Sequence, residues 1–165
     1  MASREATCLA QGHRRDALGR EARGPVRFWD SSALAALFIK NPQRERMRSY
    51  YEQDPVIAMW WATPIEITSA LTRQEREGSL TSSDTDAIIQ RLQDVSPTWE
   101  ELQHTVRLRN TALRLLRVHP LRAADALQLA AALVAAKGDP SSIDVVCLDH
   151  RLTQAARREG FRVLE

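Results

Sequence analysis

The sequence RAADALQLAAALVAA, residues 122–136, reads as one helix that is apolar almost all the way round. Such a helix belongs in the interior of a protein, because no face of it is suited to water. One acid, Asp125, interrupts it in the expected first turn, and no Lys or Arg follows at residues 128 and 129. An unpaired buried carboxylate costs roughly several kcal/mol. We therefore expect Asp125 to face a metal site, although a first-turn acid favoured by the helix dipole is the simpler alternative.

Strand-like and helix-like segments alternate on either side of this stretch. The β-branched and aromatic residues 26–29 predict a first strand, and the apolar run 56–61 predicts a buried second strand. Further strands are expected at 143–148 and 161–164, with a short extended piece within 98–103. Helices are expected at 33–40, 43–52, 63–77, 82–95, 106–118, 122–136 and 150–159.

This alternation predicts an α/β fold with a central, mostly parallel sheet of four to five strands flanked by helices. In such sheets, ligands bind beyond the carboxyl ends of the strands. Residues 26–165 are expected to form one domain, since a chain of this size can bury a substantial core.

Composition narrows the possible partners and compartments. The net charge of +2 comes from residues 1–25, because residues 26–165 carry 18 basic and 18 acidic side chains. A neutral domain cannot bind nucleic acid through bulk charge, so any such contact needs a local basic patch or a metal. Two cysteines give no disulfide framework, which favours the cytoplasm, and no apolar run is long enough for a membrane span.

Residues 1–25 are rich in Arg, Gly and Ala without a clean apolar period, and they lack the apolar core of a secretory signal. We expect a poorly ordered leader there. A misplaced start, with translation beginning at Val26, is the alternative.

Four acids fall at the ends of predicted strands or in the first turns of predicted helices: Asp30, Glu66, Asp125 and Asp149. In a parallel sheet these positions meet at the carboxyl edge. Four carboxylates gathered there repel one another unless their pKa values rise or a divalent cation neutralises them. An oxygen-only set of ligands suits Mg²⁺ or Mn²⁺, and no His or Cys spacing in the sequence suits zinc.

Each acid also has a local explanation. Asp30 and Asp149 are suited to cap the helices that follow them. Glu66 completes a capping box with Thr63, and taken alone that is the better explanation. These separate explanations do not account for an acid at every strand–helix junction in the absence of a Gly-rich phosphate loop. We therefore favour a shared metal site.

The chain from Val26 onward resembles a PIN domain, and within that class the VapC toxins of bacterial toxin–antitoxin pairs. The resemblance is carried by FWDSSAL (28–34), TPIEITSAL (63–71), LRAADALQLA (121–130) and VCLDHRL (146–152), the last followed by Ala155, Ala156 and Gly160. The resemblance implies a three-layer sandwich and a Mg²⁺- or Mn²⁺-dependent ribonuclease. It also implies a small antitoxin partner and a homodimer.

By this resemblance, the family's acidic, catalytic and metal-binding positions fall on Asp30, Glu66, Asp125 and Asp149. Ser32 falls near a hydroxyl position that supports the site, with Ser31 as the alternative. Candidates for contacts to RNA phosphates are Arg44, Arg46, Arg48, Arg114, Arg117 and Arg122, although a solvated helix face is the simpler explanation for most of them.

Other residues and other functions were weighed against this interpretation. Trp60 and Trp61 are expected in the core, and a catalytic histidine is not expected. A phosphatase with Asp30 as nucleophile would need a second Asp two residues later, where Ser32 stands. A PIN fold that only binds RNA or protein, without catalysis, would not need all four acids.

Overall fold

A computed structural model describes residues 27–165; the expected leader 1–25 and Val26 lie outside the described residues. The elements are β1 (Arg27–Trp29), α2 (Ser31–Phe38), α3 (Arg44–Gln53), β2 (Ile57–Trp60), α4 (Thr63–Arg76), α5 (Ser82–Val95), η1 (Ser96–Thr98), β3 (Glu100–Leu102), α6 (Val106–Val118), α7 (Ala123–Ala135), η2 (Pro140–Ser142), β4 (Asp144–Val146), α8 (His150–Arg158) and β5 (Arg162–Leu164).

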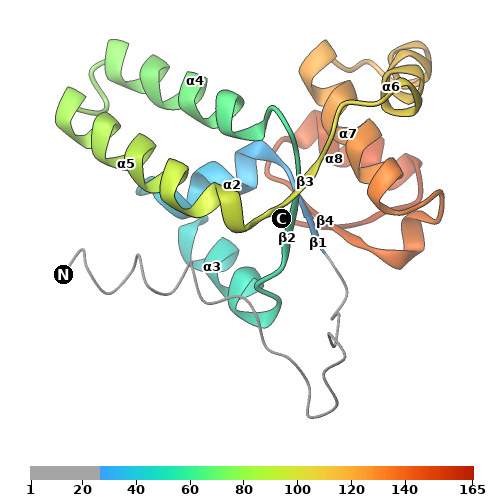
Figure 1. Cartoon of the computed structure of the whole chain (residues 1–165), viewed down its shortest axis with the longest axis horizontal. Helices are drawn as coiled ribbons and strands as arrows, with labels where there is room; N and C mark the ends of the chain where they lie inside the picture. The colour runs from blue at the N-terminus through green and yellow to red at the C-terminus, as the bar shows by residue number, and fades with distance from the viewer. Residues whose placement is uncertain (1–26) are drawn as a thin grey trace.

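The five strands form one sheet in the order β3-β2-β1-β4-β5, and every pair is parallel (Figure 1). The central strand β1 fixes the register, because Phe28 lies opposite Ala58 of β2 and Val145 of β4. The predicted α/β class and parallel sheet are therefore confirmed. All five strands are short, so the helices supply most of the buried surface.

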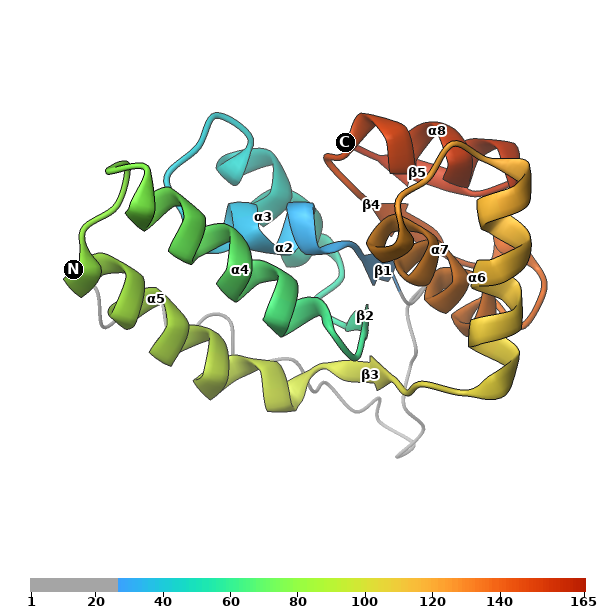
Figure 2. The same ribbon diagram turned by 90° about the horizontal axis from the view of Figure 1, so that it is seen from above.

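Two helical layers cover the sheet, one on each face (Figure 2). Successive residues of a strand point to opposite faces. Phe28 accordingly packs in a core with α6, α7 and α8, whereas its neighbour Trp29 packs in a second core with α2, α3, α4 and α5. The same alternation separates Trp60 from Met59 in β2. The result is the expected three-layer sandwich.

Helix α7 is buried along most of its length, as its composition predicts. Ala126, Leu129 and Ala130 are almost fully buried, and alanine at these positions allows the helix to lie close to the sheet. The first turn is different, because Ala123 and Ala124 are exposed and Asp125 is half-buried. None of the described helices is long and apolar enough to cross a membrane.

The predicted capping box at the start of α4 is wrong. The helix begins at Thr63 itself, and its N-cap is Ala62, which makes no side-chain capping bond. The chain turns directly after β2, where the backbone N–H of Trp61 donates to the carbonyl of Leu102 at 3.1 Å. Thr63 and Glu66 are therefore both free to bond outside their own helix, and both contact Gln128 of α7.

A candidate active site at the carboxyl edge of the sheet

Four helices begin at the carboxyl edge of the sheet, and each brings one of the predicted acids with it. Asp30 joins β1 to α2, and Asp149 lies between β4 and α8. Glu66 is in the first turn of α4, and Asp125 is in the first turn of α7. The helices come from both faces of the sheet, so the edge is supplied by both layers.

Asp30 is the most buried of these acids, with 3% of its surface exposed. Its Oδ2 accepts the backbone N–H of Ser32 at 2.9 Å, which caps α2, and it also accepts the Ser32 hydroxyl. Burial raises the pKa of Asp30 above its ordinary value, although the bonds from Ser32 partly offset this effect. Asp30 is therefore both a helix cap and a carboxylate poorly solvated by water.

Cys147 lies beneath the Asp30 carboxylate. Its Sγ is 3.6 Å from Asp30 Oδ2 and 3.5 Å from the backbone oxygen of Asp149. Burial raises the pKa of the thiol, with the charge of Asp30 as a further cause, so the thiol stays protonated and can donate. Cys147 is fully enclosed, and its thiol helps to orient Asp30.

The two serines after Asp30 have different partners. The Ser32 hydroxyl accepts the backbone N–H of Leu148 at 2.9 Å while donating to Asp30, so it links the ends of β1 and β4. A bond from the Ser31 side chain lowers the pKa of Glu66. Both serines therefore contact a predicted site acid, each a different one.

Glu66 is half-buried and bonded to α7. Its Oε2 accepts Nε2 of Gln128 at 2.8 Å, and the same amide group lies 3.2 Å from Thr63 Oγ1. The pKa of Glu66 is raised mainly by burial, and further by the charges of Asp30 and Asp125. Asp30, which follows β1, and Asp125 of α7 therefore both lie within electrostatic reach of Glu66.

Asp125 and Asp149 are more accessible than the other two acids. Asp125 is half-buried, and its Oδ2 accepts the backbone N–H of Arg122 at 3.0 Å. Asp149 is exposed, and its Oδ1 caps α8 through the backbone N–H of Leu152 at 2.8 Å. Each makes the local bond that its position predicts, which leaves its second oxygen available to another partner.

No cation of the described residues 27–165 forms an ion pair with any of these four carboxylates. The donor chemistry fits a hard divalent cation, because the side chains offer oxygen alone and burial raises the pKa values of Asp30 and Glu66, with the charges of Asp30 and Asp125 as a further cause for Glu66. Within the same residues, however, no three His, Cys, Asp or Glu side chains are close enough to form a finished metal cage. Water or a substrate oxygen would have to complete the coordination.

The candidate RNA-binding arginines are scattered. Arg44, Arg46 and Arg48 belong to α3, whose last turn packs at the amino ends of the strands, where Arg27 donates to the carbonyl of Tyr50 (Figure 1). The structure does not bring them to the carboxyl edge, since α3 leads into the start of β2.

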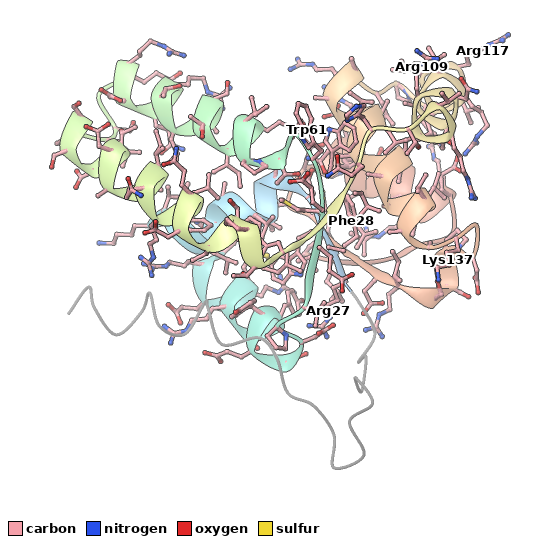
Figure 3. The ribbon with its side chains drawn as sticks, in the orientation of Figure 1. Arg27, Phe28, Trp61, Arg109, Arg117 and Lys137 are labelled. Carbon is pink, nitrogen blue, oxygen red and sulfur yellow. The ribbon has the colours of Figure 1, made fainter. Side chains whose placement is uncertain are left out.

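On the opposite layer, Arg114 is paired with Glu159 at 2.6 Å, whereas Arg117 extends outward from α6 (Figure 3). Arg122 alone of the six candidates stands beside a site acid, as the exposed N-cap residue of α7, three residues before Asp125.

Three residues at this edge were missed or misjudged in the sequence. Gln128 is 1% exposed and is the single polar side chain between 126 and 136, which could have marked it. Trp61 is not core, because it is 44% exposed just beyond the end of β2. His104, which follows β3, contacts the Trp61 ring. The apolar run 56–61 gave no signal for where the strand ends.

Fold and site together define an α/β protein of the PIN class with a carboxylate-lined edge, and comparison with known proteins agrees. No family model matches the sequence. Two relatives from Mycobacterium tuberculosis, ribonuclease VapC45 of strain CDC 1551 / Oshkosh and ribonuclease VapC49 of strain ATCC 25618 / H37Rv, are each 31% identical over 147 residues. The matches cover 84% of this chain and 94% of each relative. The chain therefore belongs to the VapC ribonuclease family.

Solved structures support the fold independently. FitAcB from Neisseria gonorrhoeae superposes with a TM-score of 0.61 at 14% identity, over 85% of this chain and 97% of that chain. VapC20 of Mycobacterium tuberculosis, described as a sarcin-ricin loop cleaving toxin, gives a TM-score of 0.57 at 19% identity, over 82% and 95% of the two chains. At these identities, the similarity supports the shared PIN fold.

Proposed function

We propose that this protein is the toxin of a toxin–antitoxin pair, an endoribonuclease that hydrolyses RNA phosphodiester bonds with Mg²⁺ or Mn²⁺. The observation that carries the proposal is that the charges of Asp30 and Asp125 both act on Glu66, while no described cation is paired with any of the three. Membership of the VapC ribonucleases supports RNA as the substrate class. A divalent ion is needed because, without it, the carboxylate cluster would repel the RNA phosphates.

A bound divalent ion supplies an acidic water and a clamp for the phosphate oxygens. Asp30, Glu66 and Asp125 would hold it, with Asp149 as the outermost ligand. The protein's own residues prepare these ligands: Ser32 and Cys147 engage Oδ2 of Asp30, and Gln128 engages Oε2 of Glu66. A carboxylate that is not fully used in binding the ion can accept the proton of the attacking water. Arg122 is suited to an RNA phosphate approaching from the side of α7.

The direct test is cleavage of single-stranded RNA by the purified protein, with Mg²⁺ or Mn²⁺ and with EDTA, followed by sequencing of the RNA ends. We expect cleavage that depends on the ion and on Asp30 and Asp125. Hydrolysis of a small phosphate ester without RNA cleavage would instead indicate a phosphatase. Loss of both activities together with no Mn²⁺ binding would indicate a PIN fold that serves only to bind.

We also propose a small antitoxin as partner and a homodimer as the assembled state. Helix α6 exposes apolar side chains that a partner could cover, among them Val106, Leu113 and Leu116. Light scattering after size-exclusion chromatography tests the dimer, for which we expect about twice the chain mass of 18.6 kDa. A monomer mass at micromolar concentration would contradict the homodimer without affecting the proposed chemistry.

A further inference from the structure

Trp61 is the one tryptophan of residues 27–165 that the fold leaves open to water. It is 44% exposed, whereas Trp29, Trp60 and Trp99 are each 8% exposed or less. Leaving so large an apolar ring in water forgoes about 25 cal/mol for every Å² that could have been buried. Its position beyond the strand end is therefore not explained by packing.

The exposed indole is held in place. Its backbone N–H donates to the carbonyl of Leu102 at 3.1 Å. The ring makes edge-to-face contacts with His104, at 5.8 Å between centroids and 64° between planes, and with Trp60, at 6.3 Å and 71°. Such pairs stabilise a fixed ring orientation. An aromatic surface fixed in this way loses little conformational entropy when a ligand binds to it.

Trp61 lies at the same edge as the site carboxylates. It follows β2 directly and stands two residues before Thr63, which contacts Gln128 of α7. Glu66 is in the first turn of α4, which Thr63 opens. Figure 3 shows Trp61 beside the start of α4, on the side that faces α7. A strand of RNA that reached the carboxylates would therefore pass close to this ring.

We propose that Trp61, supported by His104, is a stacking subsite for an unpaired nucleobase of the RNA; this inference rests on the proposed function. Carboxylates repel phosphates, and of the six candidate arginines Arg122 alone stands beside a site acid, so an uncharged contact would add affinity that charge does not supply. Base stacking on an aromatic ring is such a contact, and it is open to any base because every base has a π-face. The subsite would hold a single strand or a loop and would exclude a paired base.

Binding is measured with a labelled single-stranded RNA in the Asp125→Asn background, so that the strand remains intact. Trp61→Ala should weaken binding about five- to hundredfold, the range of one lost stacking contact. Trp61→Phe, which keeps an aromatic face, should restore most of the affinity. Ile65→Ala is the matched control, because it removes an exposed apolar side chain of 59% exposure from α4 that has no aromatic ring, and it should leave binding unchanged. Thermal melts establish that all variants fold.

Steady-state cleavage by the otherwise wild-type protein provides a second measurement. Trp61→Ala should raise KM by a similar factor and change kcat little, because the ring binds the strand away from the reacting phosphate. Unchanged KM and unchanged RNA affinity in Trp61→Ala would overturn the subsite while leaving the ribonuclease proposal intact. The subsite would also be overturned if Trp61→Ala lost affinity only for a protein partner and not for RNA. Failure of the wild-type protein to cleave or bind RNA would overturn both proposals.

Discussion

Two acids at opposite ends of the sheet, Asp144 and Asp30, have contrasting surroundings. At the amino end, Asp144 opens β4 and is paired with Arg162 at 2.8 Å and more loosely with Arg27 at 3.9 Å. Arg27 is itself buried, and its guanidinium lies 5.9 Å from the centre of the Tyr50 ring. At the carboxyl end, the described residues provide no cation for Asp30 or Glu66.

This difference separates acids that stabilise the fold from acids held for a ligand. The molecule is able to pair its acids, as Glu159 shows, since Arg114 and His119 bond to it and lower its pKa. Leaving Asp30 and Glu66 with raised pKa values costs stability in the absence of a cation. At the carboxyl edge Asp30 and Glu66 therefore lack a described cation, whereas at the amino edge Asp144 is paired and the buried Asp54, whose pKa is also raised by burial, has the charge of Arg27 nearby.

The largest effect is expected from removing a charge at the carboxyl edge. Asp30→Asn and Asp125→Asn should each reduce RNA cleavage by about a hundred- to thousandfold, because a carboxamide cannot replace an anionic metal ligand. The metal ion itself stabilises the transition state by several kcal/mol. Asp144→Asn is the matched control at the amino edge, and it should cleave at nearly the wild-type rate. Single-turnover rates on one RNA measure all three. Wild-type cleavage by Asp125→Asn would refute the assignment of the site.

A divalent ion should stabilise the folded protein by binding at the carboxyl edge. Mn²⁺ at a hundred times its dissociation constant contributes about 2.7 kcal/mol to folding, which raises Tm by roughly 5–10 °C for a chain of this size. We expect this shift for the wild type and for Asp144→Asn, and a much smaller one for Asp30→Asn. Differential scanning calorimetry with and without Mn²⁺ tests it, and equal shifts in all three proteins would place the ion elsewhere.

Gln128 tests whether the edge is built for function at the expense of stability. Its Nε2 bonds to Glu66 and Thr63, but its Oε1 is buried without a partner in the described residues. An unpaired buried carbonyl costs about 1–3 kcal/mol. Gln128→Met fills the same space without polar atoms, so it should leave Tm unchanged or raised.

The same variant should weaken Mn²⁺ binding and slow cleavage by roughly tenfold, because Glu66 loses the bond that orients it. Calorimetric titration with Mn²⁺ provides a measurement that does not depend on turnover. If Gln128→Met lost stability and kept its Mn²⁺ affinity, the residue would be part of the packing alone.

The smallest effect concerns pH in the absence of metal. Asp30 and Glu66 have raised pKa values, so as the pH falls below neutral the folded protein takes up their protons before the unfolded chain does. Their contribution to stability therefore rises as the pH falls from the raised values toward about 4, the ordinary carboxyl range. Urea unfolding in EDTA at pH 7 and pH 5 should show a greater gain for the wild type than for Asp30→Asn. An equal gain would mean that Asp30 titrates normally.

Sequence patterns predicted the elements well because each has a strong local signal. The apolar run after Arg122 predicted α7 to within a residue at either end, and the β-branched segment before Asp30 predicted β1. Position at the carboxyl edge followed from the parallel sheet alone. What local patterns could not supply was the partner of each side chain across the layers. Thr63 and Glu66 match a capping box, yet the Glu66 side chain accepts a hydrogen bond from Gln128, which lies 62 residues later in the sequence.

Local sequence patterns also could not predict where the strand within the apolar run 56–61 ends. Trp60 and Trp61 are identical in type and adjacent, but one is 4% exposed and the other 44%. Strand β2 ends between them, at Trp60, and Trp61 is bonded at its backbone N–H to Leu102 of β3, which is distant in sequence. Likewise, helical periodicity placed Arg44 and Arg48 on α3 but could not say at which end of the sheet that helix would lie.

The order of the acids along the chain has a consequence for synthesis of the protein. Asp30 and Glu66 are translated early, whereas Asp125 and the Cys147 thiol beneath Asp30 come from the last third of the chain. An intermediate that ends before Asp125 therefore cannot assemble the carboxylate cluster, however well its first helices have folded. The candidate site can form only after synthesis has passed Asp125 and Cys147.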